Sequence, residues 1–268
     1  MFRTLGIEWM KIKNYRTFWI LLAITIICIP AFNYTVYDLM DNSFPKIRGK
    51  SIFGSPFAFP DVWLTVSWNS SLLFIIPAIL IITLTTNEFS YRTHRQNIID
   101  GWSRIQFISI KLVEVFILSI LMTLIVFLTT LYFGGIANKL PQGVGLLSNT
   151  QYLFYFFVQM ISYSTIAFLI AVFIRRAGLS MGIFFVYMVL EQFVVSYLRN
   201  KYKMNWVDYL PEEVTDRLLP QPYTQKVLNS PAAIETWHHH IPIYLGIAAV
   251  YLTVYCSITI WRFTKADL

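Results

Sequence analysis

The sequence has few charged residues and few cysteines, and each shortage argues against a class of protein. Only 13% of its 268 residues are charged, against about 25% in an average soluble domain, so an ordinary water-soluble fold is not expected. Its two cysteines, Cys28 and Cys256, both lie in apolar stretches. Neither a disulfide framework nor a thiolate metal site is therefore indicated, and we expect both side chains to serve packing.

Catalytic and nucleotide-binding motifs are also missing from the sequence. It contains no G-x-x-x-x-G-K-[ST] loop to cradle a phosphate, no His-Glu-x-x-His pair and no nucleophile elbow. No two carboxylates inside an apolar stretch have the spacing that paired acid and base catalysts need. We therefore expect a chain that is not an enzyme, that does not hydrolyse ATP, and that holds no cofactor or metal of its own.

Long apolar blocks make up most of the chain, and 56% of its residues are hydrophobic. A helix needs about 20 apolar residues to cross a hydrocarbon core about 30 Å thick. The blocks predict an all-α integral membrane protein, with one transmembrane domain over residues 1–268 and six spans at about 17–37, 62–86, 111–133, 152–174, 179–198 and 241–260. Pro30 and Pro77 lie in the first two spans and can kink them.

The orientation follows from the uneven distribution of charge between the loops. Of the 21 lysines and arginines, twelve fall on the side that holds both termini: Arg3, Lys11, Lys13, Arg16, Arg92, Arg95, Arg104, Lys111, Arg175, Arg176, Arg262 and Lys265. Acidic residues gather on the other side: Asp38, Asp41, Asp61, Asp208, Glu212, Glu213, Asp216 and Glu235. Because basic loops are retained in the cytoplasm, both termini are predicted to be cytoplasmic. Basic residues that flank spans, without forming one stripe, do not indicate nucleic-acid binding.

Two segments outside the spans have patterns of their own. Residues 1–16 mix apolar and basic side chains, which predicts an amphipathic elbow helix in the headgroup plane. Residues 199–240 form a predicted extracytoplasmic segment punctuated by prolines, where short helices such as 212–219 are expected. The run His238, His239 and His240 ends this segment. Neighbouring helical residues point about 100° apart, so these histidines fit an interfacial position better than one metal site.

Two glutamates fall inside apolar blocks, where a charge is expensive and often functional. Glu114 lies near the start of span three and can pair with Lys111. Glu191, beside Gln192 deep in span five, is a candidate intramembrane polar site. It fits a translocation surface, a proton site or a hydrogen-bonded structural carboxyl, and the sequence leaves these three roles open. Amide side chains that can join helices in the same way are Asn69, Gln159 and Gln192.

The most informative segment is the polar, basic stretch between spans two and three, residues 87–110. Its apolar residues alternate with charged ones, as in a short helix that lies against the membrane and presents a polar face to a cytoplasmic partner. An ordinary solvated loop is the alternative. The residues that we expect to contact the partner are Glu88, Phe89, Arg92, Thr93, Arg95, Ile98, Gly101, Trp102, Ser103 and Arg104.

This segment resembles the ABC-2 type permease family. In that family a glutamate at the end of span two is followed by Gly-Thr, a short apolar stretch, Ser-Arg and a lysine that begins span three. Residues at the matching offsets are Glu88, Thr93, Ile98, Ile99, Ser103, Arg104 and Lys111. The form is particularly similar to the branch of bacterial exporters that includes bacteriocin and lantibiotic immunity permeases. Arg92 departs from the family by replacing a common glycine, and Gly101 stands where many members have proline.

The resemblance implies a permease subunit of an ABC transporter that exports its cargo, in the bacterial cytoplasmic (inner) membrane and surrounded by lipid. It would pair with a second permease, identical or a sibling, and bind two copies of a cytoplasmic ATPase subunit that holds ATP and Mg²⁺. Residues 88–104 would then sit in a groove on the ATPase. Two alternatives stay open: an ion-coupled secondary transporter or channel that uses Glu191, and a lipid-modifying enzyme that uses the outer histidines.

Overall fold

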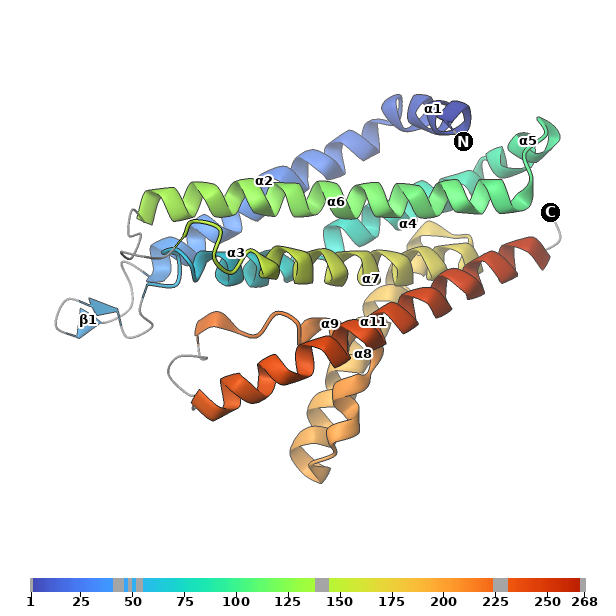
Figure 1. Ribbon diagram of the computed structural model, residues 1–268. Helices are drawn as coiled ribbons and strands as arrows, with labels where there is room; N and C mark the ends of the chain where they lie inside the picture. The colour runs from blue at the N-terminus through green and yellow to red at the C-terminus, as the bar shows by residue number, and fades with distance from the viewer. Residues whose placement is uncertain are drawn as a thin grey trace.

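The computed structural model describes residues 2–40, 46–47, 50–51, 55–137, 145–223 and 231–265. These residues form a bundle of helices with one short antiparallel pair of strands, β1 (Lys46–Ile47) and β2 (Lys50–Ser51) (Figure 1). The helices are α1 (Phe2–Lys13), α2 (Arg16–Asp38), α3 (Val62–Ser71), α4 (Ile75–Ser90), α5 (Thr93–Ile99), α6 (Arg104–Ala137), α7 (Gln151–Ile174), α8 (Ala177–Tyr202), the 3₁₀ helix η2 (Asn205–Tyr209), α9 (Pro211–Asp216) and α11 (Pro231–Lys265).

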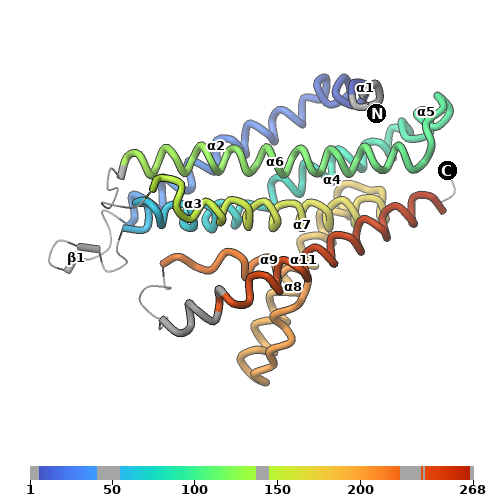
Figure 2. Tube along the Cα trace, viewed as in Figure 1, coloured from blue at the N-terminus to red at the C-terminus, as the bar shows by residue number. Residues whose placement is uncertain are grey.

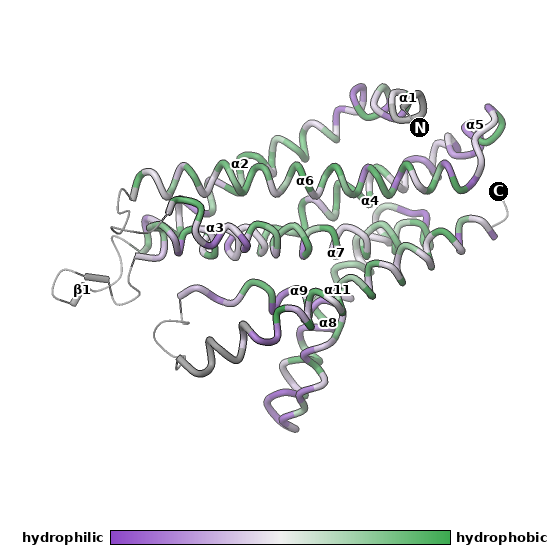
Figure 3. The backbone as a smooth tube through the Cα atoms, in the orientation of Figure 1, coloured by the Kyte–Doolittle hydropathy of each residue, from purple (hydrophilic) through white to green (hydrophobic). Residues whose placement is uncertain are grey.

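Five of the described helices are long and apolar enough to cross a membrane: α2, α6, α7, α8 and α11. The colouring by hydropathy shows the apolar stretches along these helices and polar residues toward several of their ends (Figure 3). The pair α3 and α4 passes the same test only when taken together, and would bring the number of spans to six. The all-helical membrane fold predicted from the sequence is therefore confirmed in its class.

The predicted second span, at about residues 62–86, is formed by two helices, α3 and α4, with a break between them. The chain bends by 48° between α3 and α4. Pro77 has no backbone N–H to donate to the Leu73 carbonyl, which instead accepts a 3.2 Å bond from the nitrogen of Ile76. The backbone nitrogens of Leu72, Leu73 and Phe74 also bond three residues back. Proline and this tightened turn break the span.

Most of the helices run roughly along one long direction, which α8 crosses steeply, and different features lie at the two ends (Figure 1). α1, α5 and the last turn of α11 lie at one end, and β1 lies at the other (Figure 1). The trace shows α6 running nearly the whole length between them (Figure 2). α6 begins at Arg104, one to two turns before the span predicted from residue 111, and α11 begins at Pro231, before the span predicted from residue 241. The candidate span within α11 begins at His239.

The core is built around α7, which packs against α3, α4, α6, α8, α9 and α11. Phe156 and Phe168 of α7 are each 1% exposed, and the ring of Tyr163 stacks on that of Phe74 with centroids 4.4 Å apart. The apolar windows of α8 and α11, by contrast, are only 28% and 17% buried. These two helices therefore leave most of their apolar surface for lipid or a partner.

A smaller polar contact joins α2 to α3. The side-chain amide of Asn69 donates to Asn33 Oδ1 at 3.0 Å, and Asn69 Oδ1 accepts a 2.7 Å bond from the hydroxyl of Tyr223. Asn33 also donates to Ser70 Oγ at 3.2 Å. Asn69 thus joins helices as predicted.

Of the three consecutive histidines 238–240 in α11, His239 is exposed and His240 is half-buried, while the side chain of His238 lies outside the described residues.

Candidate functional site

The predicted contact segment folds as a short helix held between two turns. α4 ends at Ser90, and Arg92 then adopts a left-handed conformation with φ of 56°, which starts α5 at Thr93. Gly101, with φ of 97°, turns the chain again toward α6. Both departures from the family pattern thus lie at residues with positive φ, the conformation that glycine adopts most readily.

The start of α6 is fixed by a capping box. The nitrogen of Gln106 donates to Ser103 Oγ at 3.1 Å, and the nitrogen of Ser103 donates to Gln106 Oε1 at 3.0 Å. This reciprocal pair satisfies two backbone donors at the first turn. Arg104 also donates from Nη1 to the Thr264 carbonyl at 2.7 Å, which ties this turn to the end of α11.

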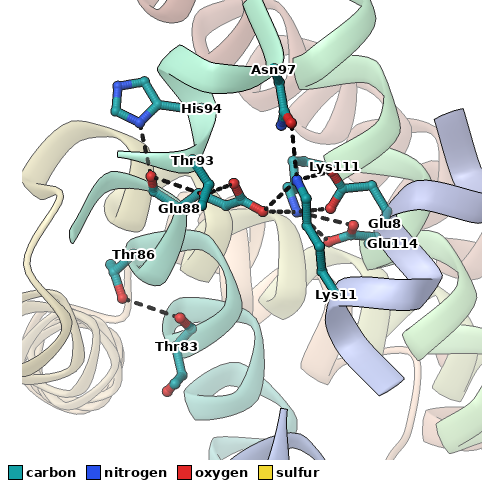
Figure 4. A network of polar contacts seen from close by, with 10 residues as sticks. All are labelled: Glu8, Lys11, Thr83, Thr86, Glu88, Thr93, His94, Asn97, Lys111 and Glu114. Atoms are coloured by element: carbon teal, nitrogen blue, oxygen red, sulfur yellow. Dashed lines mark hydrogen bonds and ion pairs between the residues drawn. The ribbon is translucent and has the colours of Figure 1, made fainter. Parts of the chain in front are cut away.

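Glu88, in the last turn of α4, connects α5 to the bundle (Figure 4). Its carboxylate accepts a hydrogen bond from the hydroxyl of Thr93 and a 3.1 Å bond from Lys111 Nζ. Its carbonyl oxygen lies 2.8 Å from Nδ1 of His94. Since Thr93 and His94 open α5, one residue holds the first turn of that helix by both its side chain and its backbone.

Next to α5 lies a largely buried cluster of five charged side chains and one amide from four helices, which we call the ion cluster: Glu8, Lys11, Glu88, Asn97, Lys111 and Glu114. Lys111, only 4% exposed, binds Glu8 at 2.6 Å, Glu88 at 3.1 Å and Glu114 at 3.0 Å. The close view shows these side chains pointing toward one another (Figure 4). A buried charge needs such partners, because desolvation is costly without them.

Lys11 supplies the second ammonium group of the ion cluster. It donates to Glu8 Oε1 at 2.7 Å and to Asn97 Oδ1 at 3.2 Å, so it joins α1 directly to α5. Its ammonium also lies 5.9 Å from the ring centroid of Trp102, within the range of a cation–π contact. α1 is therefore attached to α5 as well as to α6.

The electrostatics of the ion cluster are clearest at Glu8, which lies outside the candidate spans. Burial acts to raise the pKa of Glu8, but the charge of Lys111 and hydrogen bonds from Lys11 and Lys111 outweigh it. The pKa of Glu8 is held below its ordinary value of 4.5. Glu8 is therefore a carboxylate at neutral pH and acts as an anionic anchor for α1.

The ten predicted contact residues separate into an inner and an outer group. Glu88 lies in the ion cluster, and Thr93 binds it. Half-buried residues that pack beside the cluster or between helices are Phe89, Ile98, Trp102 and Arg104. The exposed ones are Arg92, Arg95, Gly101 and Ser103. Arg95 and its neighbours are therefore the side chains that a partner could reach.

Sequence reasoning missed Glu8, Lys11 and Asn97 as members of the site. Glu8 did carry a signal, because it is the only acidic residue in the basic stretch 1–16 and stands one helical turn before Lys11. The predicted pairing of Glu114 with Lys111 is confirmed at 3.0 Å. The sequence pattern does not identify Asn97 as a member of the site, because its inward position depends on the direction of α5 in the folded chain.

The second predicted site, at Glu191 and Gln192, lies elsewhere, on α8. Glu191 is 8% exposed, and its Oε1 accepts backbone bonds from Glu212 at 2.7 Å and Glu213 at 3.3 Å. Of the three roles left open, the hydrogen-bonded structural carboxyl fits this geometry. Gln192 donates to Asp216 Oδ2 at 2.9 Å. Both residues therefore hold α9 against α8.

The fold and these contacts define a multi-pass membrane protein in which the ion cluster holds the short helix α5 at the end that carries α1. The chain belongs to the family described as "Protein of unknown function (DUF2705)", whose model matches residues 26–268. The matched region contains α5 and Lys111 but not α1. A search of curated proteins found no match.

Proposed function

We propose that the chain is the membrane-spanning permease subunit of an ABC transporter, and that a separate ATPase subunit docks on α5. The observation that carries this proposal is that the ion cluster fixes the inward face of α5, while the outward face of α5 is charged and partly apolar. The proposal includes six spans with α3 and α4 as one broken span, α1 as the elbow helix, and both termini in the bacterial cytoplasm. It also includes a second permease as partner and export as the direction.

The two faces of α5 differ sharply. His94 and Asn97 are each 6% exposed and point into the protein. Arg92, Arg95 and Gln96 are exposed, and Ile99 is 77% exposed at the end of the helix. A large apolar side chain among arginines on a short projecting helix is typical of a protein contact, in which an apolar anchor is surrounded by polar residues.

The ion cluster supplies the means by which a push on α5 would reach the spans. Its side chains come from α1, α4, α5 and α6, and Arg104 adds α11 through the Thr264 carbonyl. Salt bridges and hydrogen bonds of this kind let packed elements move together as a rigid unit. Movement of α5 by an ATPase would therefore displace several spans at once, which is what coupling to ATP hydrolysis requires.

The structure also decides which variants test the proposal. Glu88 and Arg104 are bound within the protein, so their replacement would disturb the fold as well as the docking face. Ile99→Asp and Arg95→Glu change only exposed side chains of α5. Leu147→Asp is the matched control, because Leu147 is 68% exposed in the turn that precedes α7, and that turn lies at the opposite end of the bundle from α5 (Figure 1).

The experiment is purification of the tagged chain from its native host in mild detergent, followed by mass spectrometry of the co-purifying proteins. We expect a stoichiometric ATPase with a phosphate-binding loop in the wild type and in Leu147→Asp, and its loss in Ile99→Asp and Arg95→Glu. A stable complex without any ATPase, or an ATPase retained by both α5 variants, would contradict the proposal. The first of these outcomes would favour an ion-coupled secondary transporter or channel.

A further inference from the structure

A polar cavity lies where the broken span faces α7, α8 and α9. It has a volume of about 300 Å³, and its lining includes Phe74, Gln159, Gln192, Glu212 and Asp216. A second cavity of about 290 Å³ shares Phe74, Met188 and Gln192 with the first and is otherwise lined by apolar side chains. The two spaces together thus have an acidic end and an apolar end, and neither belongs to the ion cluster next to α5.

Two buried oxygen atoms at the acidic end have no hydrogen-bond donor among the described residues. They are Glu212 Oε1 and Gln159 Oε1, on side chains that are 1% and 4% exposed. Buried polar atoms are nearly always paired in folded proteins, so an unpaired one calls for an explanation. The amide oxygen of Gln159 is an acceptor, and Glu212 Oε1 is an acceptor when the carboxyl is ionised, so a donor would satisfy both atoms in that state.

The carboxylate of Asp216 is already fixed in place beside them. It accepts 2.8 Å and 2.9 Å bonds from the amide groups of Gln159 and Gln192, and a further bond from the hydroxyl of Tyr163. The bond from Gln159 uses its Nε2 and so leaves its Oε1 directed elsewhere. These contacts position an anionic group at the cavity without neutralising it.

Among the described residues that line the cavity, none is a lysine or an arginine. The nearby cations Arg199 and Arg217 are both bound to Asp208 and Glu213, at distances of 2.5 to 2.9 Å. Two carboxyl groups therefore face this space with no counter-ion from the described side chains that line it. A bound cation would pair with Asp216, favour the ionised form of Glu212 and satisfy the unpaired acceptors at once.

The walls and the size of the cavity indicate what kind of cation fits. Trp68, Phe74 and Tyr163 give it aromatic walls, and aromatic faces attract ammonium and guanidinium groups. A volume of about 300 Å³ lies at the lower end of the range for small-molecule pockets, of about 300 to 1,000 Å³. The adjoining apolar cavity offers room for the uncharged part of such a molecule.

We propose that this cavity binds a small organic cation, with an ammonium or guanidinium group between Glu212 and Asp216 and its apolar body toward Met188. Gln159 Oε1 accepts a further hydrogen bond from the same group. The inference goes beyond the proposed transporter function, because the site is complete within this chain. Binding is expected whether or not an ATPase docks on α5, so the two proposals fail separately.

The experiment is titration calorimetry on the purified full chain in lipid nanodiscs, with empty nanodiscs as the blank. The probes are phenethylguanidinium and its neutral isostere phenethylurea. We expect saturable binding of the guanidinium and none of the urea. Glu212→Gln, which keeps the shape and removes the carboxyl that a bound cation would ionise, is expected to weaken binding by at least about tenfold. Asp100→Asn, which removes an exposed carboxylate after α5, is the matched control and should bind as the wild type.

A second variant fills the cavity without changing its charge. Met188→Trp adds bulk where the two cavities meet and is also expected to weaken guanidinium binding by at least about tenfold, since the site then excludes the apolar body. Gel filtration establishes that each variant is folded and monodisperse. Equal binding of the urea, unchanged binding by Glu212→Gln, or no saturable binding of phenethylguanidinium by the wild type would each overturn the proposal.

Discussion

Lys111 Nζ lies 2.6 Å from Glu8 Oε2, so the first turns of α6 are bound to a helix that precedes them by 103 residues. Both side chains are almost fully buried, at 4% and 2% exposure. Ion pairs at the surface contribute little to stability because water screens them, whereas a buried charge that loses its partner is strongly destabilising. The Lys111–Glu8 pair therefore makes the attachment of α1 sensitive to single substitutions.

Replacing Lys111 with methionine tests this dependence. The change keeps the apolar stem but leaves Glu8, Glu88 and Glu114 without their shared ammonium group. We expect a loss of about 3–5 kcal/mol in the free energy of unfolding, the usual cost when one partner of a buried pair is removed. Thermal unfolding in detergent measures it. Lys13→Met, at an exposed position of the same basic stretch, is the control and should change stability by less than about 0.5 kcal/mol. Equal effects of the two substitutions would refute the importance of the ion cluster.

Acidification should release α1 for the same reason. The pKa of Glu8 lies below its ordinary value of 4.5, so its contribution to stability is fully present above pH 4.5. That contribution is lost as pH falls through the lower pKa of the folded state, because protonated Glu8 no longer attracts Lys111 and Lys11. Protease cleavage of α1 should accelerate below about pH 4.5 in the wild type. In Glu8→Gln, cleavage should be faster at neutral pH already, and an acid-induced rise of equal size in this variant would argue against Glu8 as the titrating group.

The sequence predicted the membrane class and the region of the contact segment because both depend on local pattern. Twenty-residue apolar blocks identify spans whatever their packing, and residues 87–110 stood out by polarity alone. Which residues of this segment face the protein and which face outward could not be predicted from the sequence. Whether Asn97 faces inward and Ile99 outward depends on the turns at Arg92 and Gly101, which set the direction of α5 in space.

Long-range contacts account for the rest of what the sequence could not show. From the sequence, Asp216 was only one of several acidic residues in a predicted outer segment. In the structure it accepts hydrogen bonds from Gln159 of α7 and Gln192 of α8. The break at Leu72 to Phe74 was also hidden, since Pro77 predicts a kink but not its position or its 48° size. The cavity exists only because this break and α9 meet at α7.

Gly101 is the position where the turn after α5 most restricts the choice of residue. Its φ of 97° is rarely adopted by residues with a side chain, although no neighbouring atom lies within 4 Å of where a Cβ would stand. Gly101→Ala is therefore expected to cost about 1–2 kcal/mol of stability through backbone strain alone. Gly178→Ala is the control, because Gly178 lies within α8 and also has no atom within 4 Å of where a Cβ would stand. This variant should have unchanged or increased stability. Thermal unfolding of both variants gives the comparison, and a neutral Gly101→Ala would show that this turn can adopt another conformation.

The pH dependence of stability gives a separate view of the acidic cavity. Burial raises the pKa of Glu212 to about 9, with further contributions from the negative charges of Glu191 and Asp216. Tyr255 of α11 is another titratable neighbour. The unfolded chain loses this proton near pH 4.5, the ordinary value, while the folded chain keeps it to about pH 9. The contribution of Glu212 to stability therefore falls as pH rises between these values.

Glu212→Gln removes this titration and keeps the shape of the side chain. The variant should gain thermal stability over the wild type as pH rises from 5.5 to 8.5, with the smallest difference at the acidic end, because only the wild type must take up a proton at residue 212 when it folds. Asp100→Asn, at an exposed carboxylate, should show no such trend. Phenethylguanidinium should narrow the gap at pH 8.5, since a bound cation stabilises the ionised form of Glu212 in the wild type and has no such effect in the variant. A pH-independent difference between wild type and Glu212→Gln would mean that Glu212 does not titrate in the cavity.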